Sequence, residues 1–198
     1  MPDWDADSPR LRRNLTLVLR AVRASALRRD LPAVNAARAW HREMMAGLDV
    51  PKTAWVGRFR GERGVGVARV WVGTMEGVPP AGVATQLAQF ERRLQSVVAA
   101  VDQRFPTGVE LDADGIAAVI DLSAWAHAEW IRIHPLANGN GRTARIWANF
   151  LLMRYGLPPV FLLRPRPDGE YAAAAVSAMA GKWKPTAAML KAMLLAYV

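Results

Sequence analysis

The chain contains no cysteine, which excludes disulfide bonds and thiolate metal sites. Its three histidines are His41, His127 and His134, and no two of them have the His-x-x-x-His spacing of a zinc-binding helix. We interpret His41 and His127 as structural side chains. This leaves His134 as the candidate for chemistry.

Long apolar runs are missing as well. None approaches the ~20 residues that a transmembrane helix needs. Residues 1–5 are acidic and polar, unlike a secretory signal. The sequence therefore predicts a cytoplasmic protein with no membrane partner.

Lysine is scarce and supplies only four of the 26 basic residues, although the formal net charge is +9. The arginines are dispersed from Arg10 to Arg166, and no nucleic-acid-binding motif accompanies them. The densest group lies within residues 10–23. We interpret it as the solvated face of an N-terminal helix, with an acidic partner as the alternative. A nucleic-acid partner is not expected.

The chain does have 52% hydrophobic residues over 198 positions, enough for one well-buried domain. Apolar side chains recur at helical spacing, which predicts a mainly α fold. Ser8 and Pro9 suit the start of the first helix, and residues 112–115 introduce the helix that ends at His134. Further helices are predicted around residues 34–47, 83–101 and 143–155, with two more after the turn at 164–169. Residues 55–74, where valines and tryptophans occur among glycines, predict a short β-hairpin.

Residues 134–145 carry the strongest functional pattern, His-Pro-Leu-Ala-Asn-Gly-Asn-Gly-Arg-Thr-Ala-Arg. Pro135 disfavours helical geometry at His134, so the imidazole is expected at the mouth of a loop. The glycines let an anion approach backbone N–H groups at the positive end of the next helix. Arg142 and Arg145 are three residues apart and can reach one ligand. A base, an anion cradle and two arginines suit transfer of part of a nucleoside triphosphate to a hydroxyl.

This run resembles the signature of the Fic (Fido) family, His-Pro-Phe-x-(Asp/Glu)-Gly-Asn-Gly-Arg-x-x-Arg. Weaker similarity extends to the runs at 40–43, 57–60, 70–73 and 156–159. The resemblance thus covers most of residues 34–198. It implies one compact helical Fic-like domain over residues 1–198, with a small β-hairpin flap and an additional N-terminal helix within residues 1–33.

The resemblance also implies a protein adenylyltransferase that transfers AMP from ATP, with Mg²⁺, to a Ser, Thr or Tyr hydroxyl of a target protein. His134 would be the general base, Arg142 would hold the β-phosphate and Arg145 the γ-phosphate. The anion hole would be formed by Gly139, Asn140 and Gly141. Lysine stands at the position of Gly141 in the related Doc kinases, so glycine there favours AMP transfer.

The predicted hairpin corresponds to the flap on which such proteins hold an extended piece of their target by main-chain pairing. The residues assigned to the flap are Arg69, Val70, Trp71, Val72, Gly73 and Thr74. An ordinary buried strand pair containing Val70 and Val72 is the alternative interpretation.

Two positions depart from the family pattern. Leu136 replaces the usual Phe but remains a large apolar anchor for the loop. Asn138 replaces the carboxylate that holds Mg²⁺ in the family; its amide oxygen can still bind the metal, as a weaker ligand, but it contributes no negative charge. Two alternatives therefore stay open, a phosphotransferase that uses another donor and a catalytically impaired module that binds a nucleotide or a partner.

Many members of the family are inhibited by a helix with the pattern Ser/Thr-x-x-x-Glu, whose glutamate pairs with the second arginine of the motif. None of the seven glutamates in this chain has Ser or Thr four residues before it. We therefore expect a separate antitoxin-like inhibitor, which would make this chain the toxin-like half of a pair.

Overall fold

The structure is a computed structural model that describes residues 8–66, 68–165, 167 and 169–197. Some of the sequence-based predictions lie outside the described residues. They concern the polar residues 1–5, Val67 of the predicted hairpin, and Arg166 and Asp168 of the predicted turn. Within the described part of the chain, no helix is long and apolar enough to cross a membrane.

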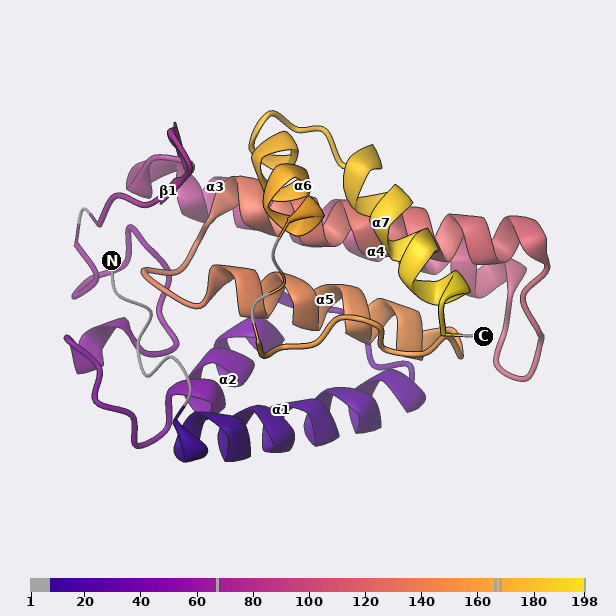
Figure 1. Ribbon diagram of the computed structural model, residues 1–198, viewed down its shortest axis with the longest axis horizontal. Helices are drawn as coiled ribbons and strands as arrows, with labels where there is room; N and C mark the ends of the chain where they lie inside the picture. Colours follow the sequence, from indigo (N-terminus) through magenta and orange to yellow (C-terminus); the bar gives the residue numbers. More distant parts are fainter. Residues whose placement is uncertain (1–7, 67, 166, 168, 198) are drawn as a thin grey trace.

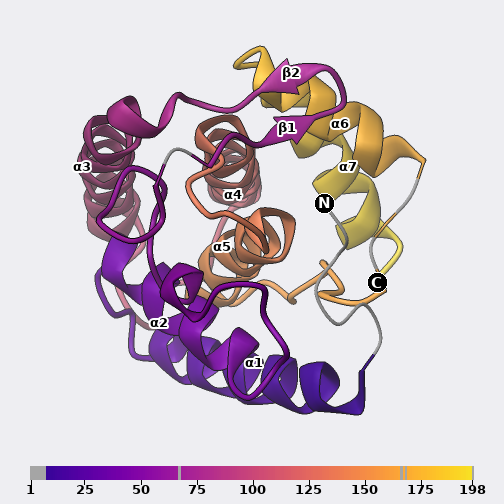
Figure 2. The ribbon, with the colours of Figure 1, turned by 90° about the vertical axis from the view of Figure 1, so that its left-hand side faces the viewer.

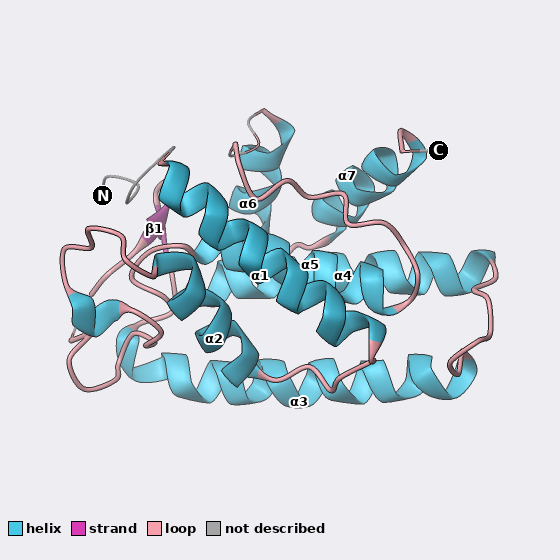
Figure 3. Ribbon diagram, turned by 90° about the horizontal axis from the view of Figure 1, so that it is seen from below, coloured by secondary structure: helices cyan, strands magenta, loops and turns pink. Residues whose placement is uncertain are grey.

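The first two helices form one side of the molecule. Helix α1 (Pro9–Leu27) begins as predicted, because the Ser8 hydroxyl accepts a hydrogen bond from the Leu11 N–H at 3.0 Å. Its apolar stripe is buried against α2 (Val34–Met45) and α5 (Asn140–Arg154). Figure 3 shows α1 and α2 covering α5 from below. The arginines on the opposite face of α1 are solvated, as their helical positions predicted.

The remaining helices surround α5 on its other sides. They are α3 (Pro80–Arg104), α4 (Ala113–Ile133), α6 (Glu170–Met179) and α7 (Lys184–Leu195). Seen end-on, α4 and α5 occupy the middle, α3 lies to one side, and α6 and α7 lie to the other (Figure 2). The prediction of a mainly α fold is confirmed.

Burial explains why α5 is the central helix. Every one of its residues except Gly141 is buried, which is the pattern of a helix enclosed on all sides. Trp147 packs edge-on against Trp40 of α2 at 4.7 Å and against Phe90 of α3 at 5.6 Å between ring centroids. Each such pair contributes about 1 kcal/mol beyond its buried area. These rings fix the axial position of α5, and with it the position of the loop that precedes it.

The predicted hairpin is real but shorter than expected and shifted along the chain. Strand β1 (Trp71–Val72) pairs antiparallel with β2 (Met75–Glu76), with Trp71 opposite Glu76. The described residues between 55 and 70 form no strand, and Trp55 instead ends a 3₁₀ turn (Thr53–Trp55). Glycines with positive φ interrupt the extended geometry there, including Gly61 (φ 88°) and Gly64 (φ 90°). The hairpin lies near the start of α5, beside α6 (Figures 1 and 2).

Candidate functional site

A cavity of about 570 Å³ opens where α4 ends and α5 begins. A cavity of this size is within the range of small-molecule sites. It brings together the motif loop, the hairpin, α6 and the segment before α6. The described residues that line it are Arg69, Val70, Trp71, Val72, Gly73, Ile131, His134, Ala137, Asn138, Gly139, Asn140, Gly141, Arg142, Arg145, Arg164, Tyr171 and Ala175. Of the residues predicted for the site, Thr74 alone does not line the cavity and lies in the turn of the hairpin.

His134 is the residue at which α4 ends. It adopts a left-handed conformation (φ 52°, ψ 55°), which is uncommon for a residue with a side chain and turns the chain sharply into the loop. Its Nδ1 lies 3.0 Å from the carbonyl oxygen of Ile131. Because a carbonyl can only accept, Nδ1 carries the proton and Nε2 keeps its lone pair. The histidine is therefore held in the tautomer that a general base requires.

Burial lowers the pKa of His134 from 6.5 to about 4, opposed by the hydrogen bond to Ile131 and assisted by the nearby charge of Arg60. The imidazole is consequently neutral at pH 7. In this state it can accept a proton, although its basicity is low in the absence of neighbouring negative charge.

The side chain of Asn140 holds the loop between His134 and α5 in place through two hydrogen bonds. Asn140 accepts a hydrogen bond from the Leu136 N–H at 2.9 Å and donates one to the Leu136 carbonyl at 2.8 Å. The Asn140 amide is thus committed to bracing the loop, so contact with an anion would come from its backbone N–H. Leu136 itself is fully buried, as its predicted role as an apolar anchor requires.

The buried side chain of His41 packs against this loop. The His41 Nδ1 accepts a hydrogen bond from the Gly57 N–H at 2.8 Å, so the ring proton is on Nε2. Gly139 (φ 82°) lies directly on this ring, and a Cβ there would be 3.3 Å from the His41 Cδ2. The backbone angle therefore favours glycine at this position, and the space beside the ring is tight. Burial is the main cause that lowers the pKa of His41 to about 4, which keeps it neutral and agrees with the structural role predicted for it.

Helix α5 begins at Asn140, three residues earlier than predicted, with Gly139 as its N-cap. The N–H groups of the first turn have no acceptor within the helix and lie at the positive end of its dipole. Gly141 leaves space above them, because a Cβ there would approach nothing closer than the Arg145 Nη1, at 3.5 Å. Arg142 is buried and lines the same cavity. Together these groups can bind a phosphate chain.

Arg145 is buried beside this helix start with uncharged partners. Its Nη1 donates to the Tyr171 hydroxyl at 3.0 Å and its Nη2 to the Leu163 carbonyl at 3.0 Å. Its Nε is buried and has no hydrogen-bond acceptor among the described residues. No carboxylate of the described chain forms an ion pair with it, so its charge is available to an anion in the cavity.

Tyr171 connects Arg145 to a second buried histidine. The His127 Nε2 lies within hydrogen-bond distance, 3.0 Å, of the Tyr171 hydroxyl, which also accepts a hydrogen bond from Arg145. Burial and the charge of Arg145 lower the pKa of His127 to about 3, so this ring is neutral. His127 therefore supports Arg145 indirectly, in agreement with the buried role predicted for it.

Sequence reasoning missed two polar residues of the cavity. Tyr171 lies at the start of α6, and Arg164 belongs to the segment predicted only as a turn. Neither has a recognisable spacing from the motif, since 26 residues separate Arg145 from Tyr171. Their presence could be recognised only once α6 was placed against α5.

Asn138 is the expected metal ligand, and it lines the cavity. The Asn138 side-chain oxygen accepts a hydrogen bond from the Gly139 N–H, so part of its capacity as a ligand is already used. Among the described residues, no three His, Cys, Asp or Glu side chains gather where they could hold a metal ion. The described residues therefore do not form a magnesium site by themselves.

The hairpin forms one wall of the cavity. Trp71 is 52% exposed although it is a large aromatic residue, and the Arg69 guanidinium lies 5.4 Å from its ring. Arg69 also forms an ion pair with Glu76, on the other strand. Val70 is buried while Val72 is only partly so, which leaves β1 at the rim of the cavity.

Comparison with known proteins agrees with this geometry. The model of the Fic/DOC family matches residues 32–152, more than half of the chain. The protein adenylyltransferase Fic of Drosophila persimilis is 36% identical over 69 residues, which cover 35% of this chain and 14% of that protein. The match thus spans about one seventh of the length of the curated relatives.

Solved structures have the same fold. Fic-1 from C. elegans superimposes with a TM-score of 0.68 at 24% identity and covers 98% of this chain and 51% of its own. The BepC effector protein of Bartonella tribocorum, with AMPPNP bound, has a TM-score of 0.59 at 16% identity, with coverage of 92% and 86%. The likeness to Fic-1 covers nearly the whole chain and therefore includes α1 and α7 as well as the motif.

Proposed function

The chain belongs to the Fic/DOC family, and on that premise we propose that it transfers AMP from ATP to a hydroxyl side chain of a target protein. One observation carries the proposal. The tautomer of His134 leaves Nε2 as an acceptor in the cavity that also holds the start of α5 and the charge of Arg145, which pairs with no carboxylate of the described residues. The relatives named as adenylyltransferases and the AMPPNP bound to BepC support the choice of nucleotide.

In the proposed step, His134 Nε2 takes the proton of the target hydroxyl while its oxygen attacks the α-phosphorus of ATP. The bond between the α-phosphorus and the bridging oxygen breaks, and pyrophosphate leaves. The Gly139 N–H donates to the Asn138 side chain and would have to release it to join the anion hole. The backbone N–H groups of Asn140 and Gly141, with Arg142 and Arg145, would hold the phosphates. Their negative charge, next to the imidazole, would raise the pKa of His134 from about 4 toward the range of an effective base.

The experiment that tests this proposal follows label from α-³²P-ATP and, in parallel, γ-³²P-ATP into the proteins of a cell lysate with Mg²⁺ present. We expect protein labelled from the α position only, with at least about a 10²-fold loss in His134→Ala. Label from the γ position only would instead indicate a kinase-like phosphotransferase. Absence of protein label from both, with ATP still bound, would favour a nucleotide-binding module.

Asn138 motivates those two alternatives and offers a second test. In Asn138→Asp, one carboxylate oxygen can keep the hydrogen bond from Gly139 while the other becomes a charged ligand. We expect half-maximal transfer at a lower Mg²⁺ concentration, by several-fold. No change, or a loss, would mean that the amide suits the native reaction.

The target would be held along β1, whose rim position and exposed Trp71 support this part of the proposal. We also propose that a separate antitoxin-like protein supplies the inhibitory glutamate that this sequence does not provide in the family's pattern. Growth arrest on expression, absent for His134→Ala, would be the expected sign. Harmless high-level expression together with full transfer activity would contradict a toxin-like role.

A further inference from the structure

Arg60 is a buried cation that the proposed reaction does not use. It is 1% exposed and ranks with the tryptophans among the largest fully enclosed side chains. Isolated charges are buried at a high cost unless a specific arrangement compensates them. The surroundings of Arg60 must therefore compensate its charge.

All of its hydrogen bonds in the described structure go to backbone carbonyls. Its Nε donates to the His134 carbonyl at 2.7 Å, and its Nη2 to that of Ile133 at 3.1 Å. Its Nη1 reaches the Ala68 carbonyl at 3.1 Å, while Nη2 also reaches Val78 at 2.7 Å. The guanidinium thus binds three chain segments at once, namely the end of α4 and both sides of the hairpin.

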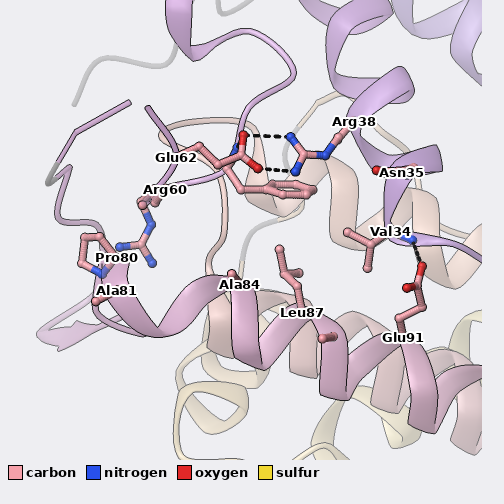
Figure 4. A pocket seen from close by; sticks show the side chains of 13 residues that line it. Val34, Asn35, Arg38, Arg60, Glu62, Pro80, Ala81, Ala84, Leu87 and Glu91 are labelled. Atoms are coloured by element: carbon pink, nitrogen blue, oxygen red, sulfur yellow. Dashed lines mark hydrogen bonds and ion pairs between the residues drawn. The ribbon is translucent and has the colours of Figure 1, made fainter. Parts of the chain in front are cut away.

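The nearest carboxylate in the sequence does not pair with it. Glu62 is only two residues away but forms its ion pair with Arg38 of α2. A second cavity, of about 310 Å³, lies between α2, α3 and the loop that carries Arg60 and Glu62. Figure 4 shows the pair at this cavity, with the Arg60 guanidinium turned away from it toward Pro80. The guanidinium is therefore oriented toward the carbonyls, two of which lie at the end of α4, where partial negative charge suits a cation. Glu76 of β2 adds a longer-range electrostatic attraction.

The hairpin also touches His134 directly. A Cβ built on Gly77, the residue after β2, would lie 2.7 Å from the His134 Cβ and 3.3 Å from the Arg60 Nη2. The Gly77 N–H donates to the Val70 carbonyl at 3.0 Å, which closes the base of the hairpin. The hairpin and the histidine therefore meet at one junction, and Arg60 spans it.

We propose that Arg60 is a positioning residue that fixes the hairpin relative to His134, so that a target hydroxyl rather than water receives the AMP group. This inference rests on the proposed function, because the target is held on the hairpin and the base is His134. If the junction loosens, water attacks the α-phosphorus in place of the hydroxyl. The products are then free AMP and pyrophosphate.

The test compares Arg60→Lys with the same substitution at Arg58, which is exposed and bonds the Arg63 carbonyl. Lysine keeps the charge but cannot bridge three segments with one nitrogen. With α-³²P-ATP and lysate proteins, we expect the ratio of protein-bound to free AMP to fall about tenfold in Arg60→Lys and not in Arg58→Lys. Affinity for ATP should be unchanged. An equal fall of both products, in proportion to the folded fraction, would show a purely structural role and overturn the proposal.

A second readout does not depend on activity. In Arg60→Lys, the NMR signals of the His134 ring should shift and the Gly77 amide should exchange faster with solvent, about tenfold or more. If the wild type labels no protein, the proposed function fails, and this readout alone decides whether Arg60 fixes the hairpin relative to His134. Unchanged His134 signals and exchange would refute it.

A second variant covers the case in which Arg60→Lys does not fold. Gly77→Ala keeps Arg60 but inserts a methyl group where only 2.7 Å separates the new atom from His134. We expect the same fall in the AMP ratio and the same shift of the His134 signals. A folded Gly77→Ala with wild-type values of both would contradict coupling at this junction.

Discussion

The two ends of α5 each carry a buried arginine, and the two arginines are compensated differently. At the C-terminal end, Arg154 donates to the Asp102 carboxylate at 2.6 Å and to the Asp30 carbonyl at 2.8 Å. At the N-terminal end, Arg145 has only a phenol and a carbonyl as hydrogen-bond partners in the described structure. The same residue type is thus neutralised within the protein at one end. At the other end its charge remains for a ligand.

The difference follows from what each end of the helix can stabilise. A cation near the C-terminus interacts favourably with the dipole, and Asp102 completes the pair. A cation near the N-terminus interacts unfavourably with the helix dipole, so the dipole does not stabilise the charge of Arg145. An anion bound between Arg145 and the start of α5 would interact favourably both with the guanidinium and with the positive end of the helix dipole. On this contrast we expect Arg154 to be structural, and we propose that Arg145 binds the ligand.

Arg145→Gln removes the buried charge at the N-terminal end of α5 and has the largest expected effect. We expect protein labelling from α-³²P-ATP to fall about 10²–10³-fold, because the buried charge that meets the phosphates is lost. The free energy of unfolding should change little, since an unpaired buried charge is removed. Large destabilisation measured by urea denaturation would show instead that Arg145 is structural.

Arg154→Gln should give the opposite result. Losing the charged hydrogen bond to Asp102 is expected to cost about 2 kcal/mol of unfolding free energy, reduced by the partial exposure of Asp102 and by its remaining contact with Arg29. Transfer activity per folded molecule should stay at the wild-type level. A specific loss of activity without destabilisation would remove the contrast between the two ends.

The pH dependence of stability tests the surroundings of Arg145. The pKa of His127 is lowered to about 3 in the folded protein, against about 6.5 in the unfolded chain. The contribution of neutral His127 to the free energy of unfolding is therefore complete above pH 6.5. It is lost as the pH falls toward 3, because in this range only the unfolded state takes up the proton.

In His127→Gln, the free energy of unfolding should fall less steeply with decreasing pH, by up to about 1.4 kcal/mol per pH unit, as measured by denaturation at pH 7, 6 and 5. His41 and His134, whose pKa values are about 4, contribute with the same sign and keep part of the slope. Identical slopes in the variant and the wild type would mean that His127 is not buried in neutral form.

Tyr171→Phe sharpens the comparison with the smallest expected effect. The variant keeps the ring next to Arg145, 5.3 Å from the guanidinium, but removes the acceptor of one hydrogen bond. We expect about a fivefold loss of transfer with a higher KM for ATP. An unchanged KM would indicate that Leu163 alone positions Arg145.

Local patterns were sufficient to predict the helices and the core of the site. Ser8 begins α1 and Asp112 begins α4 through side-chain bonds to backbone N–H groups, which are interactions over three residues. The spacing of His134, Arg142 and Arg145 likewise predicted that they would line one cavity. The hairpin was placed too broadly, because the sequence did not reveal where positive φ angles at glycines interrupt the strands.

By itself, the sequence determined a helical domain of the Fic/DOC family and the residues that meet at the end of α4, because these features depend on neighbours within a few positions. Only the tertiary structure decided which groups surround them. His41 under Gly139, Tyr171 beside Arg145 and Arg60 across the junction are contacts between distant segments, with 74 residues between Arg60 and the His134 carbonyl. Such contacts leave no periodic trace, since the packing of helices around α5 brings them together.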